Sequence, residues 1–169
     1  MKMHHALEAL AKFCAILAGL VMLGITLLTC ASVVGRNFLQ QAINGDFEMV
    51  GFAAGAAVAL FLPWCQIRRG NIIVDFFTTK SSEATQNFLD RFGALLLAGV
   101  MALMTWRSVL GGMNAYNTNS GSMMLGFPEW IVYAFMVPPM TLTAIIALYQ
   151  CAFGFDEQAE AEDNPELAV

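Results

Sequence analysis

The sequence predicts an all-α membrane protein with four transmembrane helices and a short amphipathic segment between the second and third helices. Hydrophobic residues make up 58% of the 169 residues, and charged residues only 12%, about half the share in a soluble domain. The mean hydropathy is +0.63, and the apolar residues form long blocks. We expect spans at about residues 13–35, 49–67, 86–110 and 130–153, within one membrane domain of residues 1–155.

The net charge of −5 arises mainly in the C-terminal segment. Residues 156–169 hold six of the 13 acidic residues, which leaves seven acidic residues against eight basic ones in residues 1–155. We interpret residues 156–169 as an acidic, disordered tail. The near-neutral remainder lacks the basic surface of a nucleic-acid-binding protein.

Residues 13–35 form the first charge-free run, which would measure about 35 Å as a helix and so cross a bilayer. The run is too long for a signal peptide and lacks a small-residue cleavage site, so we expect it to be retained. His4 and His5 precede it. Neighbouring residues point to different faces of a helix, so these two histidines do not predict a metal site.

The first connection runs from Arg36 to Glu48 and contains the turn sequence Asn44-Gly45-Asp46. An acidic residue near the start of the second span suits the positive end of a helix. Arg36 and Glu48 are close enough in sequence to form an ion pair across the connection. The alternative, equally open, is that each anchors its own helix in the membrane interface.

The second charge-free run covers residues 49–67 and contains small residues at every fourth position. Gly51, Gly55 and Ala59 would share one helix face. Such a strip allows the backbone of another helix to approach closely. We therefore predict tight helix packing on this face.

The second connection begins with Arg68 and Arg69 and extends to residue 82. Four apolar side chains fall on one face at helical spacing, which predicts an amphipathic segment lying along the membrane surface. They are Ile72, Ile73, Phe76 and Phe77.

A third helix is expected at about residues 83–113. Its charge-free run, residues 92–106, is short and is bracketed by Arg91 and Arg107. Long arginine side chains can extend towards the interface and lengthen the effective span. We therefore place both arginines at the edges of the membrane.

The fourth helix is expected to carry Pro128 in its first turn and Trp130 at the membrane interface. Pro138 and Pro139 should kink it.

Basic residues predict the orientation, because cytoplasmic connections carry more lysine and arginine. With four spans, the side of the termini holds six basic residues and the other side only Arg36 and Arg107. We therefore predict that both termini lie in the cytoplasm. The six are Lys2, Lys12, Arg68, Arg69, Lys80 and Arg91.

The charge-free runs also indicate which chemistry to exclude. None contains a charged residue or a histidine, and the four cysteines form no CxxC pair. Polar-substrate transporters usually place ionisable groups inside their spans, and membrane haem needs axial ligands there. We expect neither catalysis nor a cofactor or metal. The pattern favours a helical membrane subunit that packs against a larger protein.

Three short motifs occur in a distinctive order. The first is an arginine that closes span one and a glutamate that opens span two, here Arg36 in VVGRNF and Glu48 in NGDFEMVGF. The second is a basic turn that leads into an "H-I-x-V-D"-like sequence, here Arg68-Arg69-Gly70-Asn71-Ile72-Ile73-Val74-Asp75. The third is a Pro-x-Trp opening of span four followed by a further proline, here Pro128-Glu129-Trp130 and Pro138.

In this order the motifs resemble the small membrane subunit, DctQ-like, of tripartite ATP-independent periplasmic (TRAP) transporters, over nearly the whole of residues 13–149. The chain departs from the family pattern at Asn71, where the family often has histidine. With the Gly51, Gly55 and Ala59 strip, the candidate partner-contact and anchoring residues are Arg36, Glu48, Arg68, Arg69, Asn71, Asp75, Pro128 and Trp130.

The resemblance implies a scaffold subunit in a sodium-coupled, binding-protein-dependent importer of the bacterial inner membrane. Its partners would be a large, many-spanning permease subunit, a periplasmic substrate-binding protein that docks transiently, and membrane lipids. The substrate would be an organic acid or a similar small solute, carried by the large subunit. No cofactor is implied.

Two other functions are compatible with the sequence. One is a membrane anchor or assembly subunit of a different complex, and the other is a small transporter that works alone as a homodimer. The second would need a charged residue within a span. Affinity purification distinguishes the three, because they predict a many-spanning partner, an unrelated partner and a lone dimer.

Overall fold

The computed structural model describes residues 2–38, 40, 43–68 and 83–153. These residues form four helices: α1 (Lys2–Phe38), α2 (Asp46–Ile67), α4 (Glu83–Asn117) and α5 (Trp130–Phe153). All four are long and apolar enough to cross a membrane. The described residues contain no β-strand, only an isolated bridge between Gly121 and Pro128. The predicted all-α membrane class with four spans is thereby confirmed.

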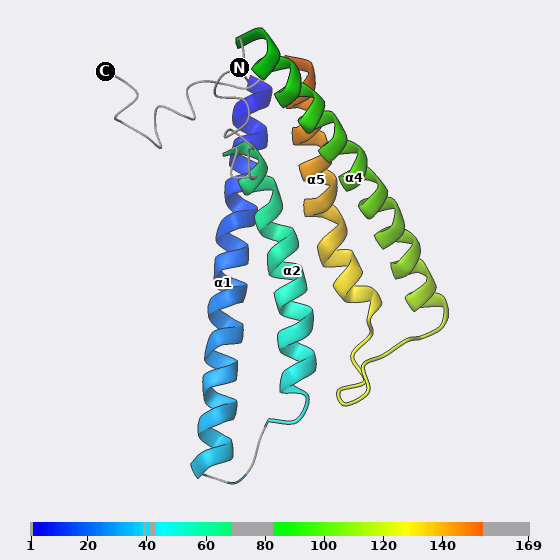
Figure 1. The fold of residues 1–169 in the computed structure, drawn as a ribbon. Coiled ribbons are helices and arrows are strands. Elements are labelled where there is room, and N and C mark those ends of the chain that lie inside the picture. Colours follow the sequence, from blue (N-terminus) through cyan, green and yellow to red (C-terminus); the bar gives the residue numbers. More distant parts are fainter. Residues whose placement is uncertain (1, 39, 41–42, 69–82, 154–169) are drawn as a thin grey trace, which may run out of the picture.

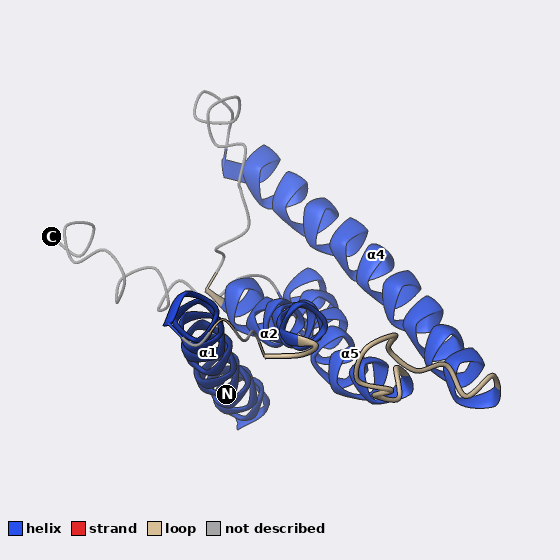
Figure 2. Cartoon of the chain, turned by 90° about the horizontal axis from the view of Figure 1, so that it is seen from below, coloured by secondary structure: helices blue, strands red, loops and turns tan. Residues whose placement is uncertain are grey.

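The four helices lie side by side in a row whose order differs from the chain order. α1 packs on α2, α2 on α5, and α5 on α4, so that α1 and α4 are the outer members (Figures 1 and 2). Along the helix axes the bundle has two ends. The start of α2 and the loop between α4 and α5 lie at one of them, which we call the Gly45 end. The opposite end, where α2 finishes, is the Ile67 end.

Small side chains bring neighbouring helices together. Most buried apolar residues are alanines, so helix backbones can approach closely without large side chains between them. These buried alanines include Ala18 on α1, Ala57 and Ala59 on α2, Ala94, Ala98 and Ala115 on α4, and Ala144 and Ala147 on α5.

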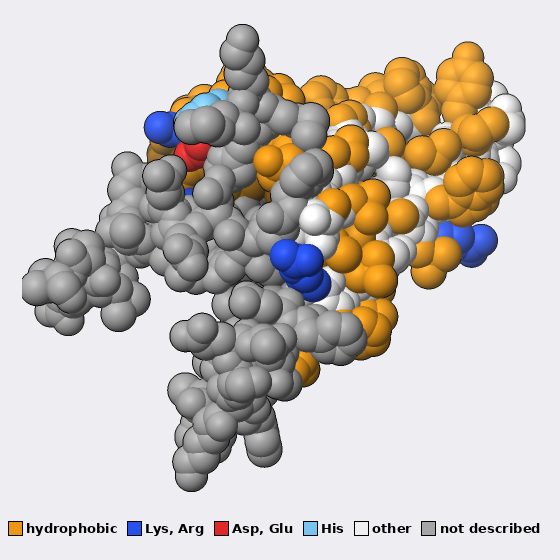
Figure 3. All heavy atoms as spheres, turned by 90° about the horizontal axis from the view of Figure 1, so that it is seen from above, with side chains coloured by type: hydrophobic (Ala, Val, Ile, Leu, Met, Phe, Trp, Pro, Cys, Tyr) orange, Lys and Arg blue, Asp and Glu red, His pale blue; other side chains and the backbone are white. Residues whose placement is uncertain are grey.

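A row has two open faces, and most of its apolar surface is not covered by the chain itself. Of the 18 most apolar consecutive residues of α1, only 6% are buried, and for α2 and α5 the buried fraction of the corresponding segment is 33%. In the view of Figure 3, taken from above Figure 1, hydrophobic side chains dominate the described surface that can be seen and charged ones are few. Lipid or another membrane protein must cover these faces.

α1 starts well before the charge-free run, because the head of the chain has its own packing partners. Ala11 is completely buried beside Ile67 of α2 and Ile146 of α5, and Leu7 packs against the same cluster. The head is therefore part of the helix that crosses the membrane.

α4 ends later than expected, at Asn117, because its two glycines are packing positions. A Cβ atom at Gly111 or Gly112 would lie only 3.1 or 3.0 Å from the Tyr133 side chain of α5. The absence of a side chain lets this ring lie against α4, and the helix continues past both glycines.

The expectation that Pro128 lies in the first turn of the fourth helix is wrong by two residues. α5 begins at Trp130, while Pro128 bridges to Gly121. The carbonyl of Pro128 nevertheless accepts a hydrogen bond from the Ile131 N–H at 3.3 Å. Pro128 thus supports the start of the helix from just outside it.

The candidate span of α4 runs from Arg91 to Asn117, and Arg107 lies inside it. The helix continues for ten residues after Arg107 and so extends beyond the expected end of the span at about residue 110.

Several predicted features fall outside the described residues. These are the amphipathic segment after Arg68, the candidate residues Arg69, Asn71 and Asp75, and the acidic tail of residues 156–169.

Candidate functional site

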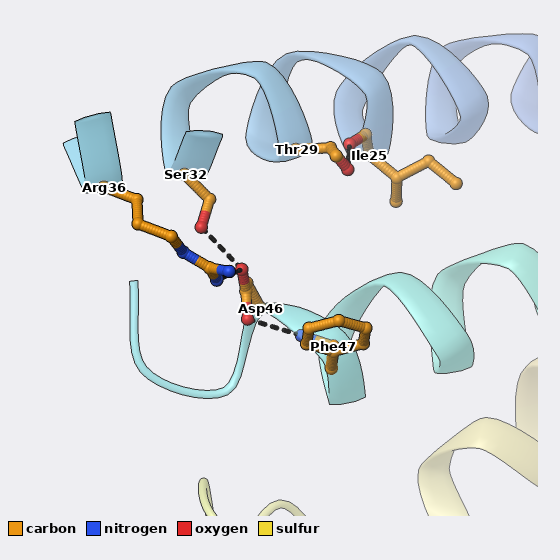
Figure 4. A network of polar contacts seen from close by, with 6 residues as sticks. All are labelled: Ile25, Thr29, Ser32, Arg36, Asp46 and Phe47. Atoms are coloured by element: carbon orange, nitrogen blue, oxygen red, sulfur yellow. Dashed lines mark hydrogen bonds and ion pairs between the residues drawn. The ribbon is translucent and has the colours of Figure 1, made fainter. Parts of the chain in front are cut away.

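The charged residues of the first connection form a compact network at the Gly45 end (Figure 4). The buried Ser32 hydroxyl of α1 donates a hydrogen bond of 2.5 Å to Asp46 Oδ2, and Arg36 lies 3.8 Å from the same oxygen. The other carboxylate oxygen, Oδ1, accepts the Phe47 N–H at 2.8 Å. This network ties α1 to the first turn of α2. The acidic partner of Arg36 is therefore Asp46.

Glu48 has a different role from the ion pair that its position in the sequence suggested. Its Oε1 accepts the backbone N–H of Met124 at 3.0 Å, and its Oε2 accepts that of Leu125 at 3.2 Å. Both donors belong to the loop between α4 and α5, residues 118–129. One carboxylate at the start of α2 thus holds a loop that is 76 residues away in sequence.

The loop also has internal order. Ser122 N–H donates to the Phe127 carbonyl at 2.9 Å, and Gly126 N–H donates to the Ser122 carbonyl at 3.0 Å. The Phe127 ring lies 6.1 Å from the Phe52 ring of α2. The loop is therefore a defined turn docked on α2.

An aromatic pair stands beside this loop, where α4 ends and α5 begins. Tyr116 and Trp130 make an edge-to-face contact with ring centroids 5.9 Å apart. Tyrosine and tryptophan concentrate at membrane–water interfaces. The pair is thus of a kind typical of a membrane–water interface, and the location of Trp130 at that interface stays a prediction.

Gly45, just before α2, lies directly against Leu125 of the loop. Its φ is +78°, and a Cβ atom there would lie 2.5 Å from Leu125 Cγ. Gly45→Ala should therefore lower the free energy of unfolding by more than the roughly 1–2 kcal/mol of left-handed backbone strain alone. Thermal unfolding in detergent measures this. Gly126→Ala is the matched control, because Gly126 has φ +64° and no atom within 4 Å. Equal losses for the two variants would contradict the close contact at Gly45.

The strip of small residues on α2 divides between two environments. Gly55 faces α5, where its Cβ position lies 3.9 Å from Met136 Sδ, and Ala59 is buried. Gly51 is exposed, with nothing within 4 Å of its Cβ position. A helix does approach the strip, but near Gly55 it belongs to the same chain.

A pair of glutamines joins α2 to α5 towards the Ile67 end. Gln66 Nε2 donates to Gln150 Oε1 at 2.7 Å, and Gln150 Nε2 donates to the Gln66 carbonyl at 3.1 Å. Both side chains are buried. Near them the Arg68 guanidinium lies 5.3 Å from the centre of the Trp64 ring, a cation–π distance that suits an interfacial anchor.

The described residues contain no group of three histidine, cysteine or acidic side chains that could hold a metal ion. A groove of about 380 Å³ between α4 and α5 is lined mainly by apolar and aromatic side chains, among them Val109, Tyr133 and Pro138. An anion that left water for this groove would find no charged group.

Sequence reasoning missed the Glu48 contact with the loop and the glutamine pair. Both had a weak signal. The loop of residues 118–129 has no basic side chain that could attract a carboxylate, but its glycines predict a tight turn whose backbone amides can act as donors. Gln66 and Gln150 are isolated side-chain amides near the ends of apolar runs. Neither pattern specifies a partner by itself.

Comparison with known proteins gives one match. The family model described as "Tripartite ATP-independent periplasmic transporters, DctQ component" matches residues 25–155, which contain the Gly45-end network, the docked loop and the glutamine pair. Neither the curated proteins nor the solved structures contain a significant match.

Proposed function

The chain belongs to the DctQ family of tripartite ATP-independent periplasmic transporter components, and from this premise we propose that it is a scaffold subunit. It would serve a sodium-coupled, binding-protein-dependent importer of an organic acid or a similar small solute. The chain would hold the fixed part of a large permease subunit at its proper depth. It would not bind substrate or sodium itself.

The observation that carries this proposal is that the charged side chains at the Gly45 end form hydrogen bonds and an ion pair within the chain itself. The Asp46 carboxylate bonds to Ser32 and lies beside Arg36, and the Glu48 carboxylate bonds to loop amides. These groups are engaged in holding helices and loop together. An organic anion that bound at the Gly45 end would need additional, uncommitted positive charge or aligned dipoles there.

The distribution of basic residues supports the proposed orientation of the chain, and the family supports its proposed location. We place the chain in the bacterial inner membrane with both termini in the cytoplasm, so that the Gly45 end faces the periplasm. There the docked loop is positioned to meet a periplasmic substrate-binding protein during its transient visits. The open faces of the helix row are left for the permease subunit and lipids.

Replacing Arg36 by alanine tests the scaffold function. Loss of the ion pair with Asp46 should lower the amount of assembled complex or the maximal uptake rate by a few-fold, because the α1–α2 connection loosens. The KM for substrate and the sodium dependence should stay unchanged. Uptake into reconstituted vesicles across a substrate series measures all three.

The matched control is Arg36→Lys, which keeps the positive charge. A change in substrate preference or sodium stoichiometry in Arg36→Ala would show that this residue reaches the transport path. The scaffold proposal would then be overturned. Purification of the wild-type chain without a many-spanning partner would favour an anchor or assembly subunit of another complex.

A further inference from the structure

Arg107 is a positive charge deep within a candidate membrane span. The aromatic pair Tyr116–Trp130 is of a kind typical of the interface, and Arg107 precedes Tyr116 by nine residues, about 14 Å along a helix. That distance exceeds the reach of an arginine side chain. In the other direction, Arg91 is 16 residues away, about 24 Å.

Contacts with α5 give the same depth. Ser108, the next residue, lies with its Oγ 3.9 Å from Met140 Sδ, and Gly112 packs against Tyr133. Residue 107 precedes both contact positions, so Arg107 is about level with Met140. Because α5 runs from Trp130 to Phe153, this level is well inside the helix, not at its end.

The side chain of Arg107 is on the open face of α4. The residues of α4 that pack on α5 include Ala98, Ser108 and Gly112. Arg107 is exposed, and its neighbours one turn away on the same face, Leu103 and Leu110, are 63% and 43% exposed. Within the described part of the chain, no ion pair or hydrogen bond to the Arg107 side chain is formed.

α4 is also an outer member of the row, so none of the other described helices covers this face (Figure 2). We define the Arg107 face by its exposed residues Leu96, Val100, Leu103, Arg107 and Leu110, which recur at helical spacing. It is an apolar stripe with one cation in the middle.

A cation at this depth is unfavourable against lipid tails, and such residues usually pair with an opposite charge inside a protein. We propose that the Arg107 face docks on an apolar transmembrane helix of the partner subunit that carries a carboxylate at the level of Arg107. The apolar residues supply the packing, and the ion pair sets the depth and register of the two subunits. This inference rests on the proposed function, because it assumes a larger membrane partner.

Photo-crosslinking of the co-expressed transporter complex tests the contact with Arg107 intact. A photoreactive amino acid replaces Leu103 or, separately, Leu110. We expect adducts with the permease subunit that map to an apolar segment containing an aspartate or glutamate. Adducts with lipid alone would overturn the proposal.

Substitution tests the charge. Arg107→Leu should reduce co-purification of the permease subunit about tenfold, because it leaves the partner carboxylate buried and unpaired. Arg107→Lys should retain most of the complex. Arg91→Leu is the matched control, an exposed arginine on the same helix, and should assemble normally.

Charge exchange completes the test. Arg107→Asp should abolish assembly, and replacing the crosslinked acid by arginine should restore it. Normal assembly of Arg107→Leu, or an equal loss in Arg91→Leu, would overturn the proposed ion pair. If the wild-type chain itself purifies without a many-spanning partner, the proposed function fails. If the wild-type chain co-purifies with such a partner and the Arg107 variants assemble equally well, this inference alone fails.

Discussion

Replacing Glu48 by alanine should release the loop of residues 118–129 from the start of α2 and lower the amount of assembled transporter several-fold. Among the described residues, the Met124 and Leu125 amides would lose the carboxylate that accepts hydrogen bonds from both at once. Hydrogen bonds to an ionised acceptor are stronger than neutral ones, so the loop loses its main polar tie to α2. Its remaining contact with α2 is apolar, through Phe127 and Phe52.

Hydrogen–deuterium exchange of the purified complex measures this release directly. The Met124 and Leu125 amides should exchange roughly tenfold faster in Glu48→Ala than in the wild type. Glu48→Gln should be intermediate, because one carbonyl oxygen remains as an acceptor. Glu129→Ala is the matched control, since it removes the acidic side chain at the last position of the same loop. Unchanged exchange in Glu48→Ala would mean that the turn keeps its position without the carboxylate.

The fold class could be predicted because membrane helices are encoded by local composition. A charge-free run of about twenty residues must satisfy its backbone internally, and a helix does so within the segment. α2 and α5 accordingly match their expected bounds closely. α1 and α4 are longer than expected because their extensions depend on distant residues, such as Ile146 beside Ala11 and Tyr133 over Gly111.

The candidate site was only partly predictable for the same reason. Arg36 and Glu48 stood out as isolated charges beside apolar runs, but their partners depend on which helix lies next to which. The order α1, α2, α5, α4 brings the loop of residues 118–129 to Glu48, and no feature within residues 36–48 specifies that order. The end of α4 was expected too early, because the helix continues to Asn117 and the Tyr116–Trp130 contact lies beyond the expected span of residues 86–110.

The glutamine pair should make the largest polar contribution to packing between α2 and α5. Gln66→Leu leaves the Gln150 amide oxygen without its donor in a buried site. Because little water is available there, this should lower the free energy of unfolding by about 1–2 kcal/mol. The double variant Gln66→Leu/Gln150→Leu removes both polar groups, so its loss should be smaller than the sum of the two single losses.

A double-mutant cycle, followed by unfolding in denaturing detergent, measures the coupling between the two side chains. Thr26→Val is a suitable control, because its exposed hydroxyl bonds only to the Met22 carbonyl one turn earlier and its loss should stay within about 0.5 kcal/mol. Simple additivity of Gln66→Leu and Gln150→Leu would show that the two amides act independently. The coupling is expected because the Gln66 side chain donates to Gln150, while the Gln150 side chain donates to the backbone of Gln66. The leucine at position 66 removes the first bond and keeps the second. If Gln150→Leu lowers the free energy of unfolding more than Gln66→Leu does, the difference reports the strength of the hydrogen bond from Gln150 to the Gln66 carbonyl.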